Sequence, residues 1–347
     1  MRRFLRTCGL VLLSAAQASL STLVPAAAQE KPASRPGEPK PGASGSRGFQ
    51  LHDPSTIVKE KGVYWAFATG LGVVSLRSRD LVEWERGPAV FPDPPAWIKD
   101  VVPTQRGHFW APDVIEHDGR FLLYYSVSAF GRRTSAIALA TSPSLDPEDP
   151  KYGWTDQGVV VQTRNESDHN AIDPCVVRGE KGTLWLAYGS FWSGIKLVEL
   201  DPKTGKRIAA DSPVHSLAHK DEIEAAAIYR HGDQWYLFIN WGRCCRGVRS
   251  TYDIRVGRSA EITGPYLDKD GADLQKGGGS LVLETQGRFI GPGHAGILKE
   301  GEKHWLSCHF YDGDENGRSK LAIRALEWDK DGWPVVQGEP KTPPSSR

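Results

Sequence analysis

Four acidic residues and one histidine occupy comparable places along the chain. Asp53, Asp113, Asp173, Glu224 and His294 each lead a segment in which small, apolar or β-branched residues and a polar turn precede an aromatic run. These repeat-leading residues are spaced 60, 60, 51 and 70 positions apart. Carboxyl groups held in different surroundings can serve as an acid and a base, and cleavage of a glycosidic bond requires both.

Asp53, Asp173 and Glu224 are the predicted catalytic residues. Glycoside hydrolysis needs a carboxylic acid that protonates the leaving oxygen, and a carboxylate that activates water or attacks the sugar. Glu224 is one methylene longer than the aspartates, which suits the proton donor, and a neighbouring Asp would keep it protonated through charge repulsion. Two carboxyl groups on separate elements, with room for a water molecule, would favour inversion at the anomeric carbon.

The segments that carry these residues are typical of β-strands. Aromatic and β-branched runs, such as residues 63–67, 121–125 and 235–239, alternate with Gly, Asp and Pro turns, and no long stretch has helical periodicity. Five repeats of this length, each with several strands, predict an all-β fold, a five-bladed β-propeller.

The innermost strand of each blade lines a central channel, so we expect the repeat-leading residues to converge near the axis. The alternative is that each acid only caps the turn of its own blade. We apply that alternative to Asp113, which we predict to be structural.

The N-terminal residues predict export. Arg2, Arg3 and Arg6 precede a short apolar run, and residues 26–28 are three alanines, so residues 1–28 are predicted to be a signal peptide. Residues 29–47 are rich in Pro, Gly, Ser and Lys, which predicts a flexible linker. Residues 48–340 would then form one catalytic domain. We expect the protein in the periplasm or outside the cell, without membrane attachment once the signal is cleaved.

Charge and cysteine content bear on the possible partners. The chain has 43 Lys and Arg against 42 Asp and Glu and no basic run, so no electrostatic footprint for nucleic acid is present. Four cysteines follow the signal segment, and the absence of a CxxC spacing disfavours a zinc site. Cys244 and Cys245 are adjacent, and either two free thiols or one vicinal disulfide is compatible with the sequence.

Ten short segments together resemble glycoside hydrolase family 43, and within it the arabinan endo-1,5-α-L-arabinosidases. The resemblance extends from about residue 50 to residue 334. The segments are residues 52–55, 110–114, 125–131, 134–137, 170–174, 189–195, 221–225, 244–247, 257–259 and 293–296.

The resemblance implies an inverting enzyme with a five-bladed propeller that cleaves internal α-1,5-L-arabinofuranosidic bonds in arabinan. It makes Asp53 the general base, Glu224 the general acid, and Asp173 the residue that raises the pKa of Glu224 and orients it. It also implies that His294 holds a cation, expected to be Ca²⁺, at the propeller axis through one imidazole and several waters. The implied substrate contacts are Asp53, Gly131, Asn170, Asp173, Ser190, Phe191 and Trp192.

Two positions depart from the family pattern. Residues 225–227 are three alanines where relatives usually have a proline and an aromatic residue, and Cys175 replaces a residue that is often polar. We expect the first departure to loosen a sugar subsite and the second to alter the surroundings of Asp173. The long loop over residues 91–106 is predicted to shape one rim of the cleft.

Other functions also fit the same residues. An exo-acting arabinofuranosidase or arabinanase, or a β-xylosidase, would differ from the endo-acting enzyme in the shape of the cleft. A non-catalytic carbohydrate-binding propeller would carry similar residues on every blade, whereas the repeat-leading residues here are of three types. Trp110, Phe130, Phe191 and Trp192 are candidate platforms on which sugars stack.

Overall fold

The computed structural model describes residues 50–341, and their side chains as far as residue 338. The predicted signal peptide and linker, residues 1–47, lie outside the described residues. Among the residues described, no helix is long and apolar enough to cross a bilayer.

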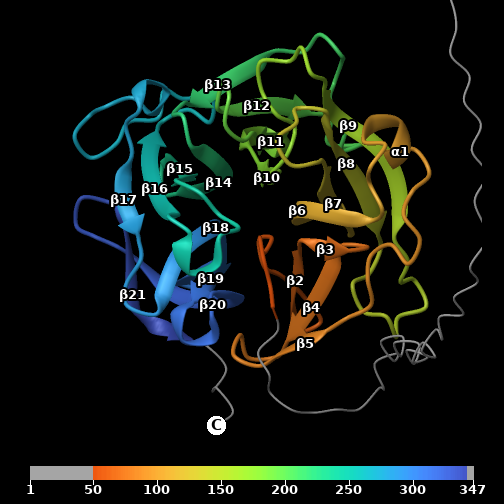
Figure 1. Ribbon diagram of the computed structural model, residues 1–347, viewed down its shortest axis with the longest axis horizontal. Coiled ribbons are helices and arrows are strands. Elements are labelled where there is room, and N and C mark those ends of the chain that lie inside the picture. The colour runs from red at the N-terminus through yellow and green to blue at the C-terminus, as the bar shows by residue number, and fades with distance from the viewer. Residues whose placement is uncertain (1–49, 342–347) are drawn as a thin grey trace, which may run out of the picture. The chain divides into compact units, whose positions relative to one another are not determined.

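Five antiparallel sheets surround a common axis as the blades of a β-propeller, which confirms the predicted fold (Figure 1). Blade 1 consists of β1 (Val58–Glu60), β2 (Val63–Ala68), β4 (Val74–Ser78) and β5 (Trp84–Arg86). Blade 2 consists of β6 (His108–His117), β7 (Arg120–Val127), β8 (Ser135–Ser142) and β9 (Thr155–Thr163), and β3 (Gly70–Leu71) adds to its inner edge.

The other three blades have four strands each. Blade 3 consists of β10 (Cys175–Arg178), β11 (Leu184–Tyr188), β12 (Ile195–Leu200) and β13 (Val214–Ala218). Blade 4 consists of β14 (Ile223–His231), β15 (Gln234–Trp241), β16 (Asp253–Ser259) and β17 (Ser280–Leu283). Blade 5 consists of β18 (Phe289–Glu300), β19 (Lys303–Asp312), β20 (Arg318–Trp328) and β21 (Pro334–Lys341).

Helical structure is confined to short connections. The one α-helix of the described chain is α1 (Ile98–Val101), in the loop between β5 and β6. The 3₁₀ turns are η1 (Glu180–Gly182), η2 (Gly247–Arg249), η3 (Leu274–Lys276) and η4 (Gly313–Glu315).

The aromatic runs form the second strand of every blade, because their side chains fill the spaces between neighbouring sheets. Phe67, Tyr125 and Phe238 are almost completely buried on β2, β7 and β15. The buried clusters cross blade boundaries: one joins blades 1 and 2, one joins blades 2 and 3, and one joins blades 3, 4 and 5. A fourth cluster includes Leu76 of blade 1 and Ile323 of blade 5, and so closes the ring. Burial between sheets therefore holds the inner strands around the axis.

Candidate active site

Asp53, Asp173 and His294 share one backbone conformation at the inner strands of three blades. Asp53 and Asp173 lie just before β1 and β10, and His294 lies in the irregular part of β18. Their φ angles are positive, at 51°, 58° and 59°. In blade 4 the residue with this conformation is Ala225, with a φ angle of 56°, and not Glu224. A positive φ costs a non-glycine residue free energy, so its recurrence marks a built-in feature of the repeat.

Glu224 and Asp113 are shifted from the predicted register. Glu224 pairs with Asn240 one residue before the bulge. In blade 2 the register shifts between Trp110 and Pro112, so Asp113 follows the irregularity. The prediction that all five repeat-leading residues are equivalent is therefore wrong. Counting residues along a chain cannot reveal a bulge, and a shift of one residue exchanges the two faces of a strand.

Asp113 joins three blades. Its role is structural, but its hydrogen bonds run to the neighbouring blades and not, as the capping alternative predicts, to the turn of its own blade. Its side chain is only 3% exposed, and its two carboxylate oxygens accept hydrogen bonds from the backbone N–H groups of Thr56 at 2.9 Å and Val176 at 2.8 Å. Thr56 belongs to blade 1 and Val176 to blade 3. Cys175 makes the equivalent link to blade 4, because its Sγ accepts from the N–H of Ile228 at 3.2 Å.

Replacing Asp113 with alanine is expected to destabilise the propeller with little direct effect on chemistry. Two backbone donors would lose their acceptor in a buried place, at a cost of about 2 to 4 kcal/mol. The measurement is the free energy of unfolding by urea, with Asp113→Asn as the milder variant because it keeps one acceptor oxygen. A stability equal to that of the unaltered protein would contradict the linking role.

The Asp53 carboxylate lies among three imidazoles. Its Oδ1 is 2.7 Å from Nδ1 of His52, and its Oδ2 accepts a hydrogen bond from the hydroxyl of Thr69 at 2.6 Å. Burial alone would raise the pKa of Asp53, but His52, and then His294 and His309, hold it well below the usual range. Burial alone would lower the pKa of His52, yet the Asp53 carboxylate raises it to about 10. Asp53 is therefore an ionised carboxylate at neutral pH.

His309 is a site residue that the sequence did not indicate. Its Nδ1 accepts a hydrogen bond from the Asp53 N–H at 3.1 Å, and its ring stacks on His52 with centroids 3.9 Å apart. Burial, followed by the charge of His52, lowers the pKa of His309 well below its usual value, so this ring is neutral. Strand β19 also carries the polar residues Lys303, His304 and Ser307, so His309 does not stand out from its neighbours in the sequence.

Glu224 is held by two hydroxyl groups. Ser190 donates to its Oε2 at 2.7 Å, and Tyr252 donates to its Oε1. Burial raises the pKa of Glu224 to about 7. The hydrogen bond from Ser190 opposes this rise, and the charge of Asp53 adds to it. Tyr252, like His309, was not predicted from the sequence. Glu224 is thus protonated over a range in which Asp53 is ionised, which is the division that an acid and a base require.

Asp173 lies beside Glu224. Its Oδ2 accepts a hydrogen bond from the N–H of Ala225 at 3.2 Å, and its own N–H donates to Ser126 Oγ at 3.1 Å. Burial, and then the Glu224 and Asp53 carboxylates, raise the pKa of Asp173 well above its usual value. Cys175 contacts the region of Asp113 rather than this carboxylate, so the predicted influence of Cys175 on Asp173 has no contact to support it.

The predicted substrate residues fall into a buried group and an exposed group. Asn170 is buried and accepts a hydrogen bond from Ser135 at 2.7 Å, while Ser190 contacts Glu224 directly. Phe191 donates its N–H to the carbonyl of Ile223 at 2.7 Å, which ties its loop to the start of β14. Gly131 belongs to an open turn with a φ angle of 68°.

Two aromatic side chains are exposed in a way that suits sugar stacking. Phe130 is 78% exposed and packs against Trp110 with ring centroids 4.7 Å apart. Trp192 is 39% exposed, and the guanidinium of Arg133 lies 5.5 Å from its ring centre. Exposed aromatic faces beside a polar site are typical of carbohydrate recognition.

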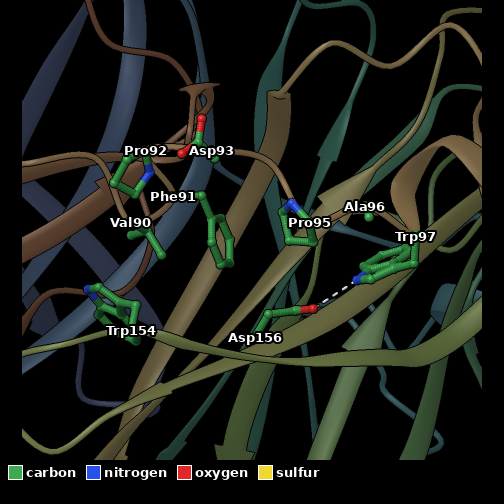
Figure 2. A pocket seen from close by; sticks show the side chains of 9 residues that line it. All are labelled: Val90, Phe91, Pro92, Asp93, Pro95, Ala96, Trp97, Trp154 and Asp156. Carbon is green, nitrogen blue, oxygen red and sulfur yellow. Dashed lines mark hydrogen bonds between the residues drawn. The ribbon is translucent and has the colours of Figure 1, made fainter.

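The loop over residues 91–106 folds toward the outer edge of blade 2, beside β9 (Figure 1). A cavity of about 620 Å³ opens there, and Figure 2 shows the indole N–H of Trp97 donating to Asp156 of β9, at 2.8 Å. None of the predicted catalytic residues lines this cavity. The prediction that the loop forms a rim of the catalytic cleft is not supported by these contacts, because β9 is the outermost strand of its blade.

The His294 imidazole is compatible with the role of the single protein ligand of a cation. Its backbone N–H donates to Asn240 at 2.9 Å, and its Nδ1 lies 3.7 Å from the Asp53 carboxylate. Burial lowers its pKa, which favours the neutral form that binds metals. Within the described residues, the clusters of three or more metal-type donors are centred on His52, and none includes His294. A cation at His294 would therefore depend on water for most of its ligands.

Comparison with known proteins places this site in a family. Residues 48–334 match the family described as glycosyl hydrolases family 43. The chain belongs to glycoside hydrolase family 43. The match covers every strand in full except β21, so the inner strands of all five blades and the carboxyl groups of the site lie within the family's common domain.

Relatives of this family 43 protein include both exo-acting and endo-acting enzymes. It is 41% identical over 308 residues to the extracellular exo-α-(1→5)-L-arabinofuranosidase ArbA of Cellvibrio japonicus, covering 85% of this chain and 88% of the relative. It is 40% identical over 292 residues to the extracellular endo-α-(1→5)-L-arabinanase 1 of Bacillus subtilis, covering 82% and 87%.

A solved structure has the same fold. The α-L-arabinanase of Cellvibrio cellulosa, complexed with arabinohexaose, superimposes on this family 43 chain with a TM-score of 0.81 at 40% identity, covering 84% of this chain and 96% of the other.

Proposed function

We propose that this protein hydrolyses internal α-1,5-L-arabinofuranosidic bonds of arabinan with inversion. The observation that carries the proposal is a pair of carboxyl groups in contrasting surroundings. Asp53 is partly buried and contacts the His52 imidazole, whereas Glu224 is buried and accepts hydrogen bonds from Ser190 and Tyr252. The arabinan specificity is supported by the names of the relatives, several of which are arabinan endo-1,5-α-L-arabinosidases.

The chemistry divides between the two carboxyl groups. Asp53 accepts a proton from a water molecule, which attacks the anomeric carbon of the bound sugar. Glu224 gives its proton to the leaving oxygen, and the Ser190 and Tyr252 hydroxyls hold the carboxyl group in place. Asp173 is the second carboxyl group beside Glu224, and its proposed role is to orient the acid and, through repulsion between the two charged forms, to favour one proton on the pair.

The substrate contacts follow from the same arrangement. We propose that Asn170 and Ser190 contact the sugar at the site of cleavage. Gly131, Phe191 and Trp192 would contact its neighbours along the polymer. Exposed Trp192 offers an aromatic face, and Gly131 lets the backbone approach the chain closely.

Early product analysis on linear α-1,5-arabinan tests the proposal. An endo-acting enzyme releases a series of oligosaccharides and lowers the viscosity early, and inversion makes the first anomer β by proton NMR. An α-anomer as the first product would overturn inversion, and absence of cleavage would overturn the function.

Exo action is the second candidate, because the exo-acting enzyme of C. japonicus is 41% identical to this chain. An exo-acting enzyme releases one product of fixed length and lowers the viscosity slowly. Monomer as the sole early product would assign the protein to this class.

The rate is expected to depend on pH with an alkaline limb near pH 7. Glu224 must be protonated to act, and its pKa is about 7, so kcat/KM should fall about tenfold per pH unit above that value. Asp53 must be ionised, and its lowered pKa keeps it so at mildly acidic pH. A plateau from about pH 5 to 7 is therefore expected, since the ordinary aspartate pKa is about 3.9. A rate that rises steadily from pH 6 to 9 would contradict the assignment of Glu224 as the acid.

We also propose that His294 holds a cation, expected to be Ca²⁺, through its imidazole and several waters. A bound cation would offset the negative charge of Asp53. It would also increase the free energy of unfolding, because it binds only the folded protein. Dialysis against a chelator is expected to lower the melting temperature by several degrees, and added Ca²⁺ should restore it, whereas His294→Ala should remove the response. A melting temperature that chelator and Ca²⁺ leave unchanged would exclude a structural cation.

Export by the N-terminal segment completes the proposal. Two relatives carry the word extracellular in their names, which supports release from the cytoplasm. N-terminal sequencing of the protein recovered outside the cytoplasm is expected to begin near Gln29, after the alanines at 26–28.

A further inference from the structure

Two adjacent thiols lie beside the His52–Asp53 pair. Cys244 and Cys245 are free cysteines whose sulfur atoms are 2.6 Å apart. Cys245 is exposed, whereas Cys244 is partly buried. We propose that Cys244 and Cys245 are an oxidation site for disulfide reagents, and that the exposed Cys245 is the attacking thiol and Cys244 the resolving one.

Contacts with the catalytic region fix the position of Cys245. Its backbone N–H donates to the hydroxyl of Tyr311 at 2.7 Å, and that hydroxyl lies 2.5 Å from Nε2 of His52. The sulfur of Cys245 is 3.8 Å from the same nitrogen. Since His52 Nδ1 contacts Asp53, one imidazole connects the thiol pair to the proposed base.

The charge at Cys245 favours reaction. The hydrogen bond between the Cys244 and Cys245 thiols lowers the pKa of Cys245 to about 5. Burial opposes this effect and His52 adds to it. The same hydrogen bond, followed by burial, raises the pKa of Cys244. Cys245 is therefore a thiolate at neutral pH with a protonated neighbour, and the thiolate is the form that attacks disulfides.

The reaction consumes one molecule of a low-molecular-weight disulfide. The Cys245 thiolate attacks one sulfur of the reagent, forming a mixed disulfide and releasing a thiolate. Cys244 then gives up its proton, which a released thiolate takes, and attacks the Cys245 sulfur. The mixed disulfide breaks, a vicinal disulfide forms, and two reduced thiol molecules leave.

Oxidation removes a negative charge from the site. The titratable groups that face Cys245 are Cys244, His52, Asp53, Tyr311, Glu224 and Asp173. The charge of Cys245 raises the pKa of Glu224 and of Asp173, so its loss lowers both. This consequence rests on the proposed function: with less Glu224 protonated, the alkaline limb of the rate profile moves to lower pH.

Intact-mass spectrometry of the full protein after reduction and exposure to glutathione disulfide tests the site. The unaltered protein is expected to lose two hydrogen atoms and carry no glutathione, and peptide mapping should place the bond between Cys244 and Cys245. Cys244→Ser should instead retain a glutathione adduct at Cys245, because the resolving thiol is absent. Cys308→Ala is the matched control, because Cys308 is buried outside the site and its loss should leave the reaction unchanged.

Two outcomes would overturn the proposal. One is a glutathione adduct that persists on the unaltered protein, and the other is a protein that keeps both thiols under the same treatment. Both outcomes are measured on the unaltered protein. They therefore depend neither on the folding of a variant nor on activity toward arabinan.

The rate profile tests the consequence separately. The oxidised protein is expected to be about two- to tenfold slower than the reduced protein at pH 8, because one pKa unit changes the protonated fraction tenfold. The two forms should be equal near pH 5.5. Identical profiles would overturn the link to Glu224 and leave the thiol chemistry intact. A protein inactive toward arabinan in both forms would overturn the proposed function alone.

Discussion

Replacing Glu224 with glutamine is expected to slow cleavage of linear arabinan by about a thousandfold, since a positioned general acid contributes about 10²- to 10⁴-fold. The glutamine amide cannot supply a proton to the leaving oxygen, yet it is the same size and can still accept the hydrogen bond from Ser190. The loss should depend on the leaving group. An arabino-oligosaccharide with a dinitrophenolate leaving group needs no protonation, so the variant should cleave it at a rate close to that of the unaltered enzyme.

Glu222→Gln is the matched control, because Glu222 lies two residues away and pairs with Arg243 outside the site. Its rates on both substrates should stay within about twofold of those of the unaltered enzyme. Equal losses on arabinan and on the activated substrate for Glu224→Gln would contradict the role of an acid. Such a result would instead indicate that Glu224 acts in binding.

Replacing Asp53 with asparagine is expected to lower kcat by about a thousandfold or more on every substrate, activated or not. The amide cannot accept the proton of the attacking water, and water attack is needed whatever the leaving group is. The pKa of His52 should fall in this variant, because the Asp53 carboxylate is the group that raises it. NMR titration of the histidine ring measures this second effect and is independent of turnover.

Asp118→Asn provides the comparison for Asp53. Asp118 also has a φ angle of 51°, but it lies exposed in the turn between β6 and β7. The asparagine there should change neither the rate nor the melting temperature appreciably. If Asp53→Asn kept activity on the activated substrate while losing it on arabinan, the roles of Asp53 and Glu224 would have to be exchanged.

Much of the fold could be predicted because it depends on side chains that recur in the chain. The aromatic runs at 63–67, 121–125 and 235–239 became the second strands β2, β7 and β15. The tendency of these side chains to be buried between sheets follows from their apolar and aromatic residue types. The number of repeats then sets the number of blades.

The neighbours of the carboxylates could not be predicted in the same way. His309 and Tyr252 contact Asp53 and Glu224 from positions 256 and 28 residues away along the chain. Neither residue belongs to a local pattern that distinguishes it from a packed core residue. Only the closure of the ring, in which blade 5 lies against blade 1, brings His309 to Asp53.

The sequence by itself determined the strand-forming runs, the five repeats and the carboxyl groups available for chemistry, because these follow from residue types and their spacing. The tertiary structure alone decided the states of those groups. Asp53 and Glu224 carry similar carboxyl groups, yet imidazoles keep Asp53 ionised, while burial raises the pKa of Glu224 to about 7 despite the hydrogen bond from Ser190. The backbone conformation decided which residues are equivalent. Asp53, Asp173 and His294 share a positive φ angle, whereas in blade 4 that conformation belongs to Ala225, one residue after Glu224. A pKa depends on the charges and solvent around a group, and those come from other blades.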